Sequence, residues 1–165
     1  HEAAAVIPFL SPGLRFFYEG QFEGRKKRLS PPLVRRPDEP IDGRLKEFYE
    51  GLLAVLRQPL VRNGQWQLLE SIPAWEGNWT WDSFIAFAWY NPDGVRLLVT
   101  VNYADHQSQC YLRLPFSDLG GLRWRLKDLI GDDVYDREGN ELQERGLYLD
   151  VPPWNASVFS LERIA

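Results

Sequence analysis

The chain has very few of the residues that usually mark a metal site or a redox centre. Its 165 residues include one cysteine, two histidines and no methionine. A single cysteine excludes an internal disulfide, and Cys110 alternates with apolar neighbours in a way typical of a buried strand residue. Because His1 and His106 are too few and too scattered for a metal site or a catalytic triad, we expect neither a metal nor a cofactor.

Long apolar runs and an excess of positive charge are also missing. The longest uncharged stretch, Ala3 to Leu14, is shorter than the roughly 20 residues that a membrane helix needs. The net charge of −4 argues against nucleic acid or an anionic membrane as a partner. We interpret the basic cluster GRKKRL with Arg35 and Arg36 as a solvated loop or as salt-bridge partners for another part of the protein. We expect a cytoplasmic location, with which the low cysteine content is compatible.

Helical and extended patterns alternate in the first 63 residues. Apolar residues at helical spacing predict a short helix from Glu2 to Leu10 and a second helix from Arg44 to Leu56, for which Asp42 is the N-cap. The apolar run from Leu14 to Tyr18 predicts a strand, and a long proline-rich loop follows it. The expected order over residues 1–63 is therefore helix, strand, loop, helix.

The character of the sequence changes at residue 64. Short aromatic and β-branched runs recur with turn signals between them, a pattern typical of an antiparallel β-sandwich. The run from Phe84 to Tyr90 has no polar side and predicts a central strand, and Gly139-Asn140 predicts a tight reversal. The chain is thus expected to be mainly β, with one domain over 1–63 and an autonomously folding sandwich over 64–165.

The motif PGLRFFYEGQ, at the end of the predicted strand, resembles the eighth barrel strand of α-amylase family glycoside hydrolases. The matching residues are Gly13, Leu14, Phe16, Phe17, Tyr18, Gly20 and Gln21. The sequence departs from the family pattern at Arg15, where proline is usual, and at Phe22, where an acid is usual. The resemblance covers nearly the whole chain and implies the C-terminal part of such an enzyme: a helix-strand-helix remnant of a parallel α/β barrel followed by an all-β domain.

The resemblance also implies where a substrate would lie. Tyr18, Glu19 and Gln21 would stand at the rim of a cleft for α-linked glucans. The two carboxylates that retaining glycosidases need would lie on earlier barrel strands, so no catalytic residue and no activity are expected in this chain alone. The pairs Glu19/Glu23 and Asp132/Asp133 fit a loop and a turn better than a catalytic pair.

The barrel remnant has a consequence for partners. Residues 1–24 carry apolar side chains that would face other barrel strands and helices in the intact enzyme. We therefore expect this segment to pack against the remainder of the parent barrel or to cause self-association.

Three tryptophans in AWEGNWTWDS suggest a second function. The rings of Trp75, Trp79 and Trp81 could stack on pyranose rings, as in a non-catalytic carbohydrate-binding module. The alternative is that these rings pack between the sandwich and the barrel. The sequence leaves both interpretations open.

Overall fold

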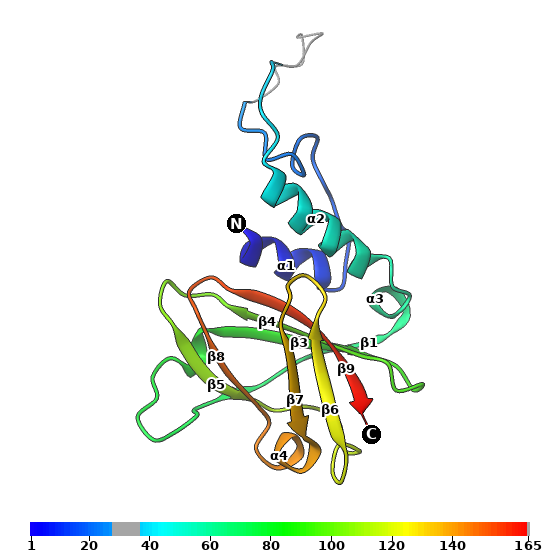
Figure 1. Ribbon diagram of the computed structural model, residues 1–165, viewed down its shortest axis with the longest axis vertical. Coiled ribbons are helices and arrows are strands. Elements are labelled where there is room, and N and C mark those ends of the chain that lie inside the picture. The colour runs from blue at the N-terminus through cyan, green and yellow to red at the C-terminus, as the bar shows by residue number, and fades with distance from the viewer. Residues whose placement is uncertain (28–36, 165) are drawn as a thin grey trace.

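The computed structural model describes residues 1–27 and 37–164, and it places two β-sheets below a small group of helices (Figure 1). The helices near the N-terminus are α1 (Glu2–Leu10), α2 (Gly43–Leu56) and α3 (Leu60–Asn63). As the sequence predicts, the side chain of Asp42 caps α2 by accepting a hydrogen bond from the Leu45 backbone N–H. No helix in the described ranges is both long and apolar enough to cross a membrane.

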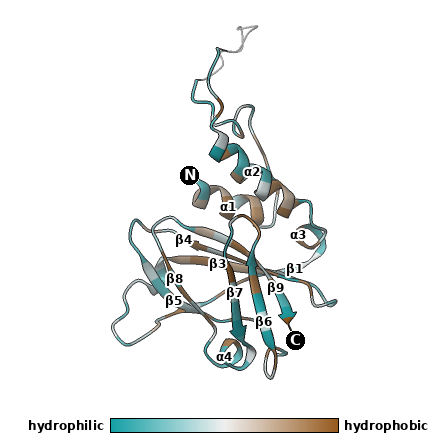
Figure 2. Ribbon diagram, in the orientation of Figure 1, coloured by the Kyte–Doolittle hydropathy of each residue, from teal (hydrophilic) through white to brown (hydrophobic). Residues whose placement is uncertain are grey.

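The first sheet has six antiparallel strands and carries the helices. Its strands, in spatial order, are β1 (Gln65–Leu68), β3 (Phe84–Tyr90), β4 (Arg96–Asn102), β9 (Ala156–Ile164), β6 (Arg123–Asp128) and β7 (Val134–Glu138). Strands β3 and β4 are mostly hydrophobic, whereas β6 and β7 are mostly hydrophilic (Figure 2). The prediction that Phe84 to Tyr90 is a central strand is confirmed, since β3 lies between β1 and β4.

The second sheet has three antiparallel strands and packs against the inner face of the first. Its strands are β2 (Ser71–Ile72), β5 (Ser108–Leu112) and β8 (Leu147–Val151). A short 3-10 helix, η1 (Trp81–Ser83), precedes β3. Cys110 lies fully buried in the core between the sheets, and this burial raises the pKa of its thiol to about 12. The mainly β, sandwich-type fold predicted from the sequence is therefore present.

Helix α1 covers the outer face of the six-stranded sheet. Its apolar residues Val6 and Leu10 are fully buried in a cluster that includes Trp89 of β3 and Val99 of β4. The indole N–H of Trp89 donates a hydrogen bond of 2.7 Å to the Leu10 carbonyl at the end of α1. The expectation that the apolar side of this helix lacks partners is thus wrong, because the sandwich itself buries it.

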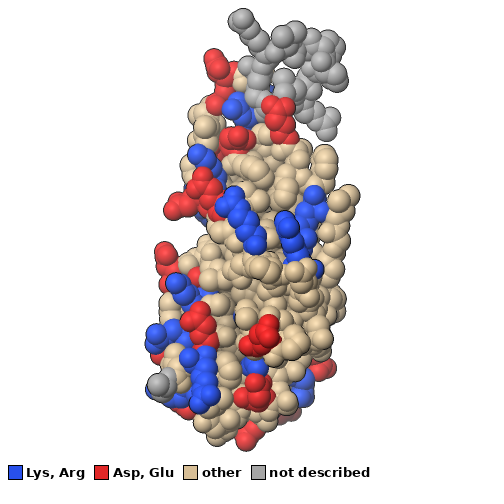
Figure 3. All heavy atoms as spheres, turned by 90° about the vertical axis from the view of Figure 1, so that its right-hand side faces the viewer, with Lys and Arg blue, Asp and Glu red and all other residues tan. Residues whose placement is uncertain are grey.

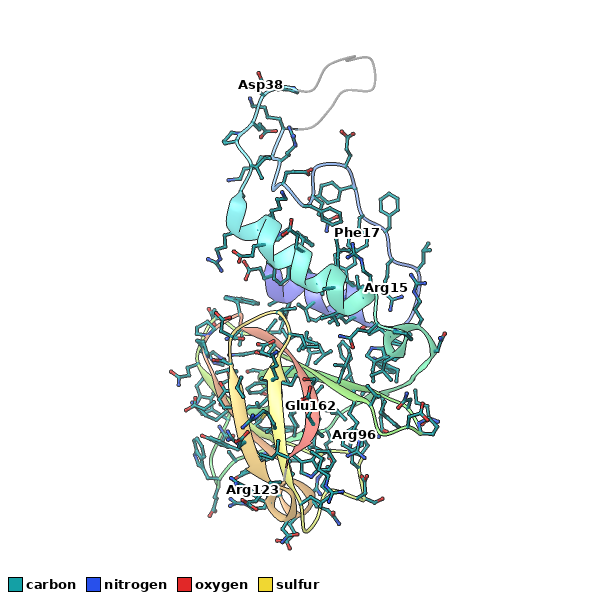
Figure 4. The ribbon with its side chains drawn as sticks, turned by 45° about the vertical axis from the view of Figure 1, so that its right-hand side comes forward. Arg15, Phe17, Asp38, Arg96, Arg123 and Glu162 are labelled. Carbon is teal, nitrogen blue, oxygen red and sulfur yellow. The ribbon has the colours of Figure 1, made fainter. Side chains whose placement is uncertain are left out.

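The predicted strand from Leu14 to Tyr18 is an extended segment that pairs with no strand among the described residues. Its odd-numbered side chains hold it to the helices, beside which they lie in Figure 4. Arg15 donates hydrogen bonds to the carbonyls of Phe9 (2.6 Å) and Val61 (3.3 Å), while Phe17 stacks on Phe9 with ring centroids 4.2 Å apart. A β-strand forms only where a neighbouring backbone accepts and donates its hydrogen bonds, and the apolar pattern of a segment does not show whether such a neighbour is present.

The tight reversal predicted at Gly139-Asn140 is wrong, because a short helix, α4 (Gly139–Glu144), begins there. The Asn140 side chain accepts a hydrogen bond from the Gly121 backbone N–H instead of closing a hairpin turn. Glycine is required at 139, since a Cβ there would lie 1.8 Å from the Leu119 carbonyl oxygen. The form of the connection after β7 therefore depends on contacts with residues 119 and 121, which no local sequence signal indicates.

Candidate functional site

A cavity of about 450 Å³ opens beside the N-terminal ends of α1 and α2, next to the turn that follows the extended segment. It is lined by His1, Glu2, Tyr18, Gln21, Gly24, Arg25, Lys26, Asp42, Arg44 and Leu45. Two of the three predicted rim residues, Tyr18 and Gln21, thus contribute to one cavity. Glu19 lies between them in an exposed turn and does not line the cavity.

Gln21 is turned inward and holds the cavity wall together. Its amide Nε2 donates a hydrogen bond of 2.9 Å to the Tyr49 hydroxyl, and its Oε1 accepts one of 3.3 Å from the Tyr18 backbone N–H. The same hydroxyl lies 3.2 Å from Nε2 of His1. Burial raises the pKa of Tyr49 above its ordinary value, so the hydroxyl stays protonated and can donate to the imidazole.

Charged groups of both signs surround the cavity. Arg44 of α2 forms an ion pair of 3.1 Å with Glu2 of α1. At the loop beyond, the carboxylate of Glu39 accepts hydrogen bonds from the backbone N–H groups of Lys26 and Lys27. Desolvation raises the pKa of Glu39, but these two hydrogen bonds and the positive charges of Lys27 and Arg25 together lower it more, so the net shift is downward. Part of the basic loop noted in the sequence, including Arg28, Arg35 and Arg36, lies outside the described residues.

The surface charge shows no field of one sign on the face seen in Figure 3, where basic and acidic side chains alternate over the sandwich. On β6 and β7 this alternation consists of cross-strand ion pairs, Arg125 with Asp136 (2.7 Å) and Arg123 with Glu138 (2.9 Å). Such exposed pairs contribute little stability each. They leave the sheet edge polar and mixed in charge.

The three predicted stacking tryptophans do not form one cluster. Trp75 and Trp79 are 52% and 70% exposed, whereas Trp81 packs against the core between the sheets. The Trp79 ring makes an edge contact with His106 at a centroid distance of 4.8 Å. The buried Asn78 side chain bonds to the Ala74 backbone N–H and to Thr80, which stabilises the loop. Trp81 is only partly exposed, so it offers less ring surface to a ligand than Trp75 or Trp79.

The structure brings together a second exposed aromatic pair that the sequence does not predict. Tyr103 and Trp154 are 46% and 49% exposed, and their rings meet edge to face with centroids 5.2 Å apart. They lie at the end of the sandwich nearest the N-terminal ends of α1 and α2, where Trp154 lines a groove of about 270 Å³. In the sequence, Pro152-Pro153-Trp154 reads only as a connection between two strands. No sequence signal joins it to Tyr103, which precedes it by about 50 residues.

No family model and no curated protein matches this chain, but solved structures do. A maltogenic α-amylase, AmyB from Thermotoga neapolitana, matches with a TM-score of 0.68 and 12% identity over 96% of the chain. The chain shares the fold of a part of an α-amylase. It covers 35% of that enzyme's length. Trehalulose synthase MutB from Pseudomonas mesoacidophila MX-45 also matches, with a TM-score of 0.44 and 16% identity over 72% of this chain and 18% of its own.

The amylase-like fold extends over the helices as well as the sandwich, because the match to AmyB leaves out only a few residues of this chain. The arrangement is therefore that of the C-terminal part of an α-amylase-family protein, as the motif at Tyr18 and Gln21 predicts. At this level of identity the comparison establishes the fold, and the role of individual residues depends on the geometry of this chain.

Proposed function

We propose that the chain is the C-terminal part of an α-amylase-like glycoside hydrolase acting on α-linked glucans. In this proposal residues 1–63 complete a catalytic barrel, and residues 64–165 form a sandwich that supports the barrel without taking part in the reaction. The amylase-like fold across nearly the whole chain supports it. The observation that carries it is the extended segment, in which Leu14, Phe16 and Tyr18 are 96%, 77% and 55% exposed.

The side chains of this segment point alternately to two sides, as they do in a strand. Arg15 and Phe17 face the helices, and Leu14, Phe16 and Tyr18 face solvent. An extended backbone with one covered side and one apolar exposed side fits a barrel strand whose neighbouring strands are supplied by another part of the protein. The remainder of the barrel is the partner that this segment would take.

In such an enzyme this chain would position residues at the end of the barrel strand and would not supply catalytic groups. The Gln21 amide fixes the turn after the strand against Tyr49 of α2, so Tyr18 and the cavity behind it stand at the end of the strand where barrel enzymes bind substrate. The nucleophile and the acid/base carboxylates would come from the rest of the barrel. The parent enzyme would then be a retaining α-glycosidase, and this chain alone would be inactive.

The proposal is tested by the coding sequence upstream of His1 and by activity. We expect that sequence to encode a barrel with two catalytic carboxylates, and we expect its full product to hydrolyse malto-oligosaccharides while residues 1–165 alone do not. In the full product, Phe16→Lys should impair assembly and activity, whereas the control Val95→Lys, at an exposed hairpin residue, should not. An upstream region without a barrel would refute the proposal.

A second candidate function is carbohydrate binding by the loop that bears Trp75 and Trp79. The observation in its favour is the exposure of both rings, at 52% and 70%. Calorimetric titration with malto-oligosaccharides tests it, using Trp79→Ala with Trp66→Ala as the control. Loss of binding in the first variant alone would support a binding module, and unchanged binding would exclude this loop.

A further inference from the structure

The cavity beside Tyr18 and the groove beside Trp154 are adjacent and share two lining residues. Glu2 and Arg44 contribute to both, and they form an ion pair with each other. The surface therefore continues from the end of the extended segment, across this ion pair, to the aromatic pair Tyr103 and Trp154 on the sandwich. The two hollows lie along one side of the molecule, at the N-terminal ends of α1 and α2.

Trp154 has an unusual backbone conformation. Its φ of +55° is the only positive φ of a non-glycine residue in the described ranges. A bulky residue pays a conformational cost in the left-handed region, so its surroundings must impose this geometry. Glycine or asparagine would adopt it more easily, yet the position holds a large ring that is half exposed to solvent.

Buried hydrogen bonds impose the conformation. The Trp154 backbone N–H donates to the Ala104 carbonyl at 3.1 Å. The fully buried Asn102 donates from its side-chain amide to the carbonyls of His106 and Pro152, at 2.9 and 3.0 Å, and its own backbone N–H donates to the Asn155 carbonyl. Asn102 thus holds the loop that carries Tyr103 against the loop that carries Trp154. The aromatic pair is preorganised by the core and not by contacts of its own rings alone.

We propose that Trp154 and Tyr103 form a sugar-binding subsite for an α-linked gluco-oligosaccharide, continuous with the cavity at Tyr18 and Gln21. An exposed indole offers a flat apolar surface for a pyranose ring, and the carboxylate of Glu2 and the guanidinium of Arg44 can hydrogen-bond neighbouring sugar hydroxyls. The identity of the sugar rests on the proposed function. A chain of glucose units leaving the active-site side of the barrel would meet this groove next.

The groove suits a small ligand better than a folded partner. Its volume of about 270 Å³ is close to the lower limit of small-molecule pockets, roughly 300 Å³. The lining combines the aromatic rings of Trp154 and Phe48, the amide of Asn155 and the charged pair of Glu2 and Arg44. This mixture matches a ligand with apolar ring faces and hydroxyl edges, whereas an apolar protein segment would leave the Glu2–Arg44 pair desolvated at a cost.

The experiment is a calorimetric titration of the 165-residue chain with maltoheptaose, using Trp154→Gly and Trp154→Asn as test variants and Trp66→Ala, on β1, as the control. We expect both Trp154 variants to bind roughly tenfold more weakly, because the stacking ring is lost. Trp154→Asn should melt at the same or a higher temperature than the parent, since asparagine tolerates the positive φ. If Trp154 had only a structural role, Trp154→Asn would instead lower the melting temperature. Trp66→Ala should bind within about twofold of the parent.

Four outcomes would overturn the proposal. These are no binding by the parent chain, unchanged affinity in the Trp154 variants, equal binding of a β-linked cello-oligosaccharide, and a Trp154 effect on self-association in ultracentrifugation without an effect on sugar affinity. Each outcome is measured on this chain alone, so failure of the subsite proposal would not refute the proposed function, which is tested by the upstream coding sequence. Conversely, sugar binding lost at Trp154 would stand even if the upstream sequence encoded no barrel.

Discussion

Replacing Trp89 with phenylalanine tests whether α1 is an integral layer of the fold. Trp89 lies in the central strand β3, is almost fully buried, and is the residue through which the sheet hydrogen-bonds the end of α1. The substitution keeps an aromatic ring in the strand but removes the indole N–H and part of the ring. The Leu10 carbonyl then loses its 2.7 Å donor in an apolar cluster that water does not reach.

The expected loss follows from these two changes. A buried carbonyl left without its donor costs about 1–3 kcal/mol. The volume removed from a well-packed site adds about 1–2 kcal/mol, because the surrounding side chains close the gap only in part. The free energy of unfolding should therefore fall by about 2–5 kcal/mol, a large part of the roughly 5–15 kcal/mol typical of a domain.

Urea unfolding followed by circular dichroism measures this loss, and hydrogen exchange of the α1 amides shows where it acts. We expect α1 amides to exchange faster in Trp89→Phe, while amides of β6 change only by the global loss of stability. Trp66→Phe is the matched control, since Trp66 pairs with Trp89 across β1 and β3 but is exposed. It should cost less than about 1 kcal/mol.

A loss below about 1 kcal/mol in Trp89→Phe would refute this reasoning, because the hydrogen bond to Leu10 would then contribute nothing to the docking of the helix. Unchanged exchange of the α1 amides would refute it independently. Two separate unfolding transitions in the parent chain would also contradict the shared apolar cluster of helices and sheet.

Four further predictions concern the rest of the chain. The pKa of Asp118 is lowered chiefly by a hydrogen bond from Arg96, so this pair stabilises the fold above the ordinary Asp value of about 3.9 and is lost as pH falls through the lowered folded value. Urea midpoints of Asp118→Asn should therefore depend less on pH in the acid range than those of the parent, and parallel curves would contradict this. Cys110 should not react with a thiol reagent in the native state, and its labelling rate in urea should follow unfolding, because its pKa is about 12. Residues 64–165 expressed alone should melt cooperatively but at a lower temperature, since the apolar outer face of β3, β4 and β9 is uncovered; a melt equal to that of the full chain would show that the helices add nothing. Self-association seen by light scattering in the parent should disappear in Phe16→Lys, and a monodisperse parent would count against association through this segment.

Much of the fold could be predicted because its signals are local. The spacing of apolar residues located α1 and α2, and the side chain of Asp42 marked the start of α2 correctly. The continuous apolar run of β3 indicated a strand buried on both faces, which it is, because helices cover one face and the second sheet covers the other. The composition of residues 64–165 was enough to predict a sandwich.

The candidate sites were harder to predict, because they depend on which residues meet. Tyr18 and Gln21 were selected by a motif, but their cavity exists because Gln21 turns inward to bond Tyr49 of α2. Among the tryptophans, residue type alone could not separate the exposed Trp79 from the partly buried Trp81, which packs against the core at η1. The backbone conformation of Trp154 could not be predicted either, because no residue near it in the sequence indicates a positive φ.

The amino-acid sequence by itself determined helices α1 and α2 and the strands of the sandwich, because these follow from periodicity and capping within a few residues. The amylase-like order of helices and sandwich was expected from the resemblance of one motif to a known family. Only the tertiary structure decided what the elements pack against. Helix α1 packs on the six-stranded sheet, and Arg15 holds the extended segment to the helices, because side chains distant in sequence meet there. The same long-range hydrogen bonds, from Asn102 above all, bring Tyr103 and Trp154 together, which no local pattern encodes.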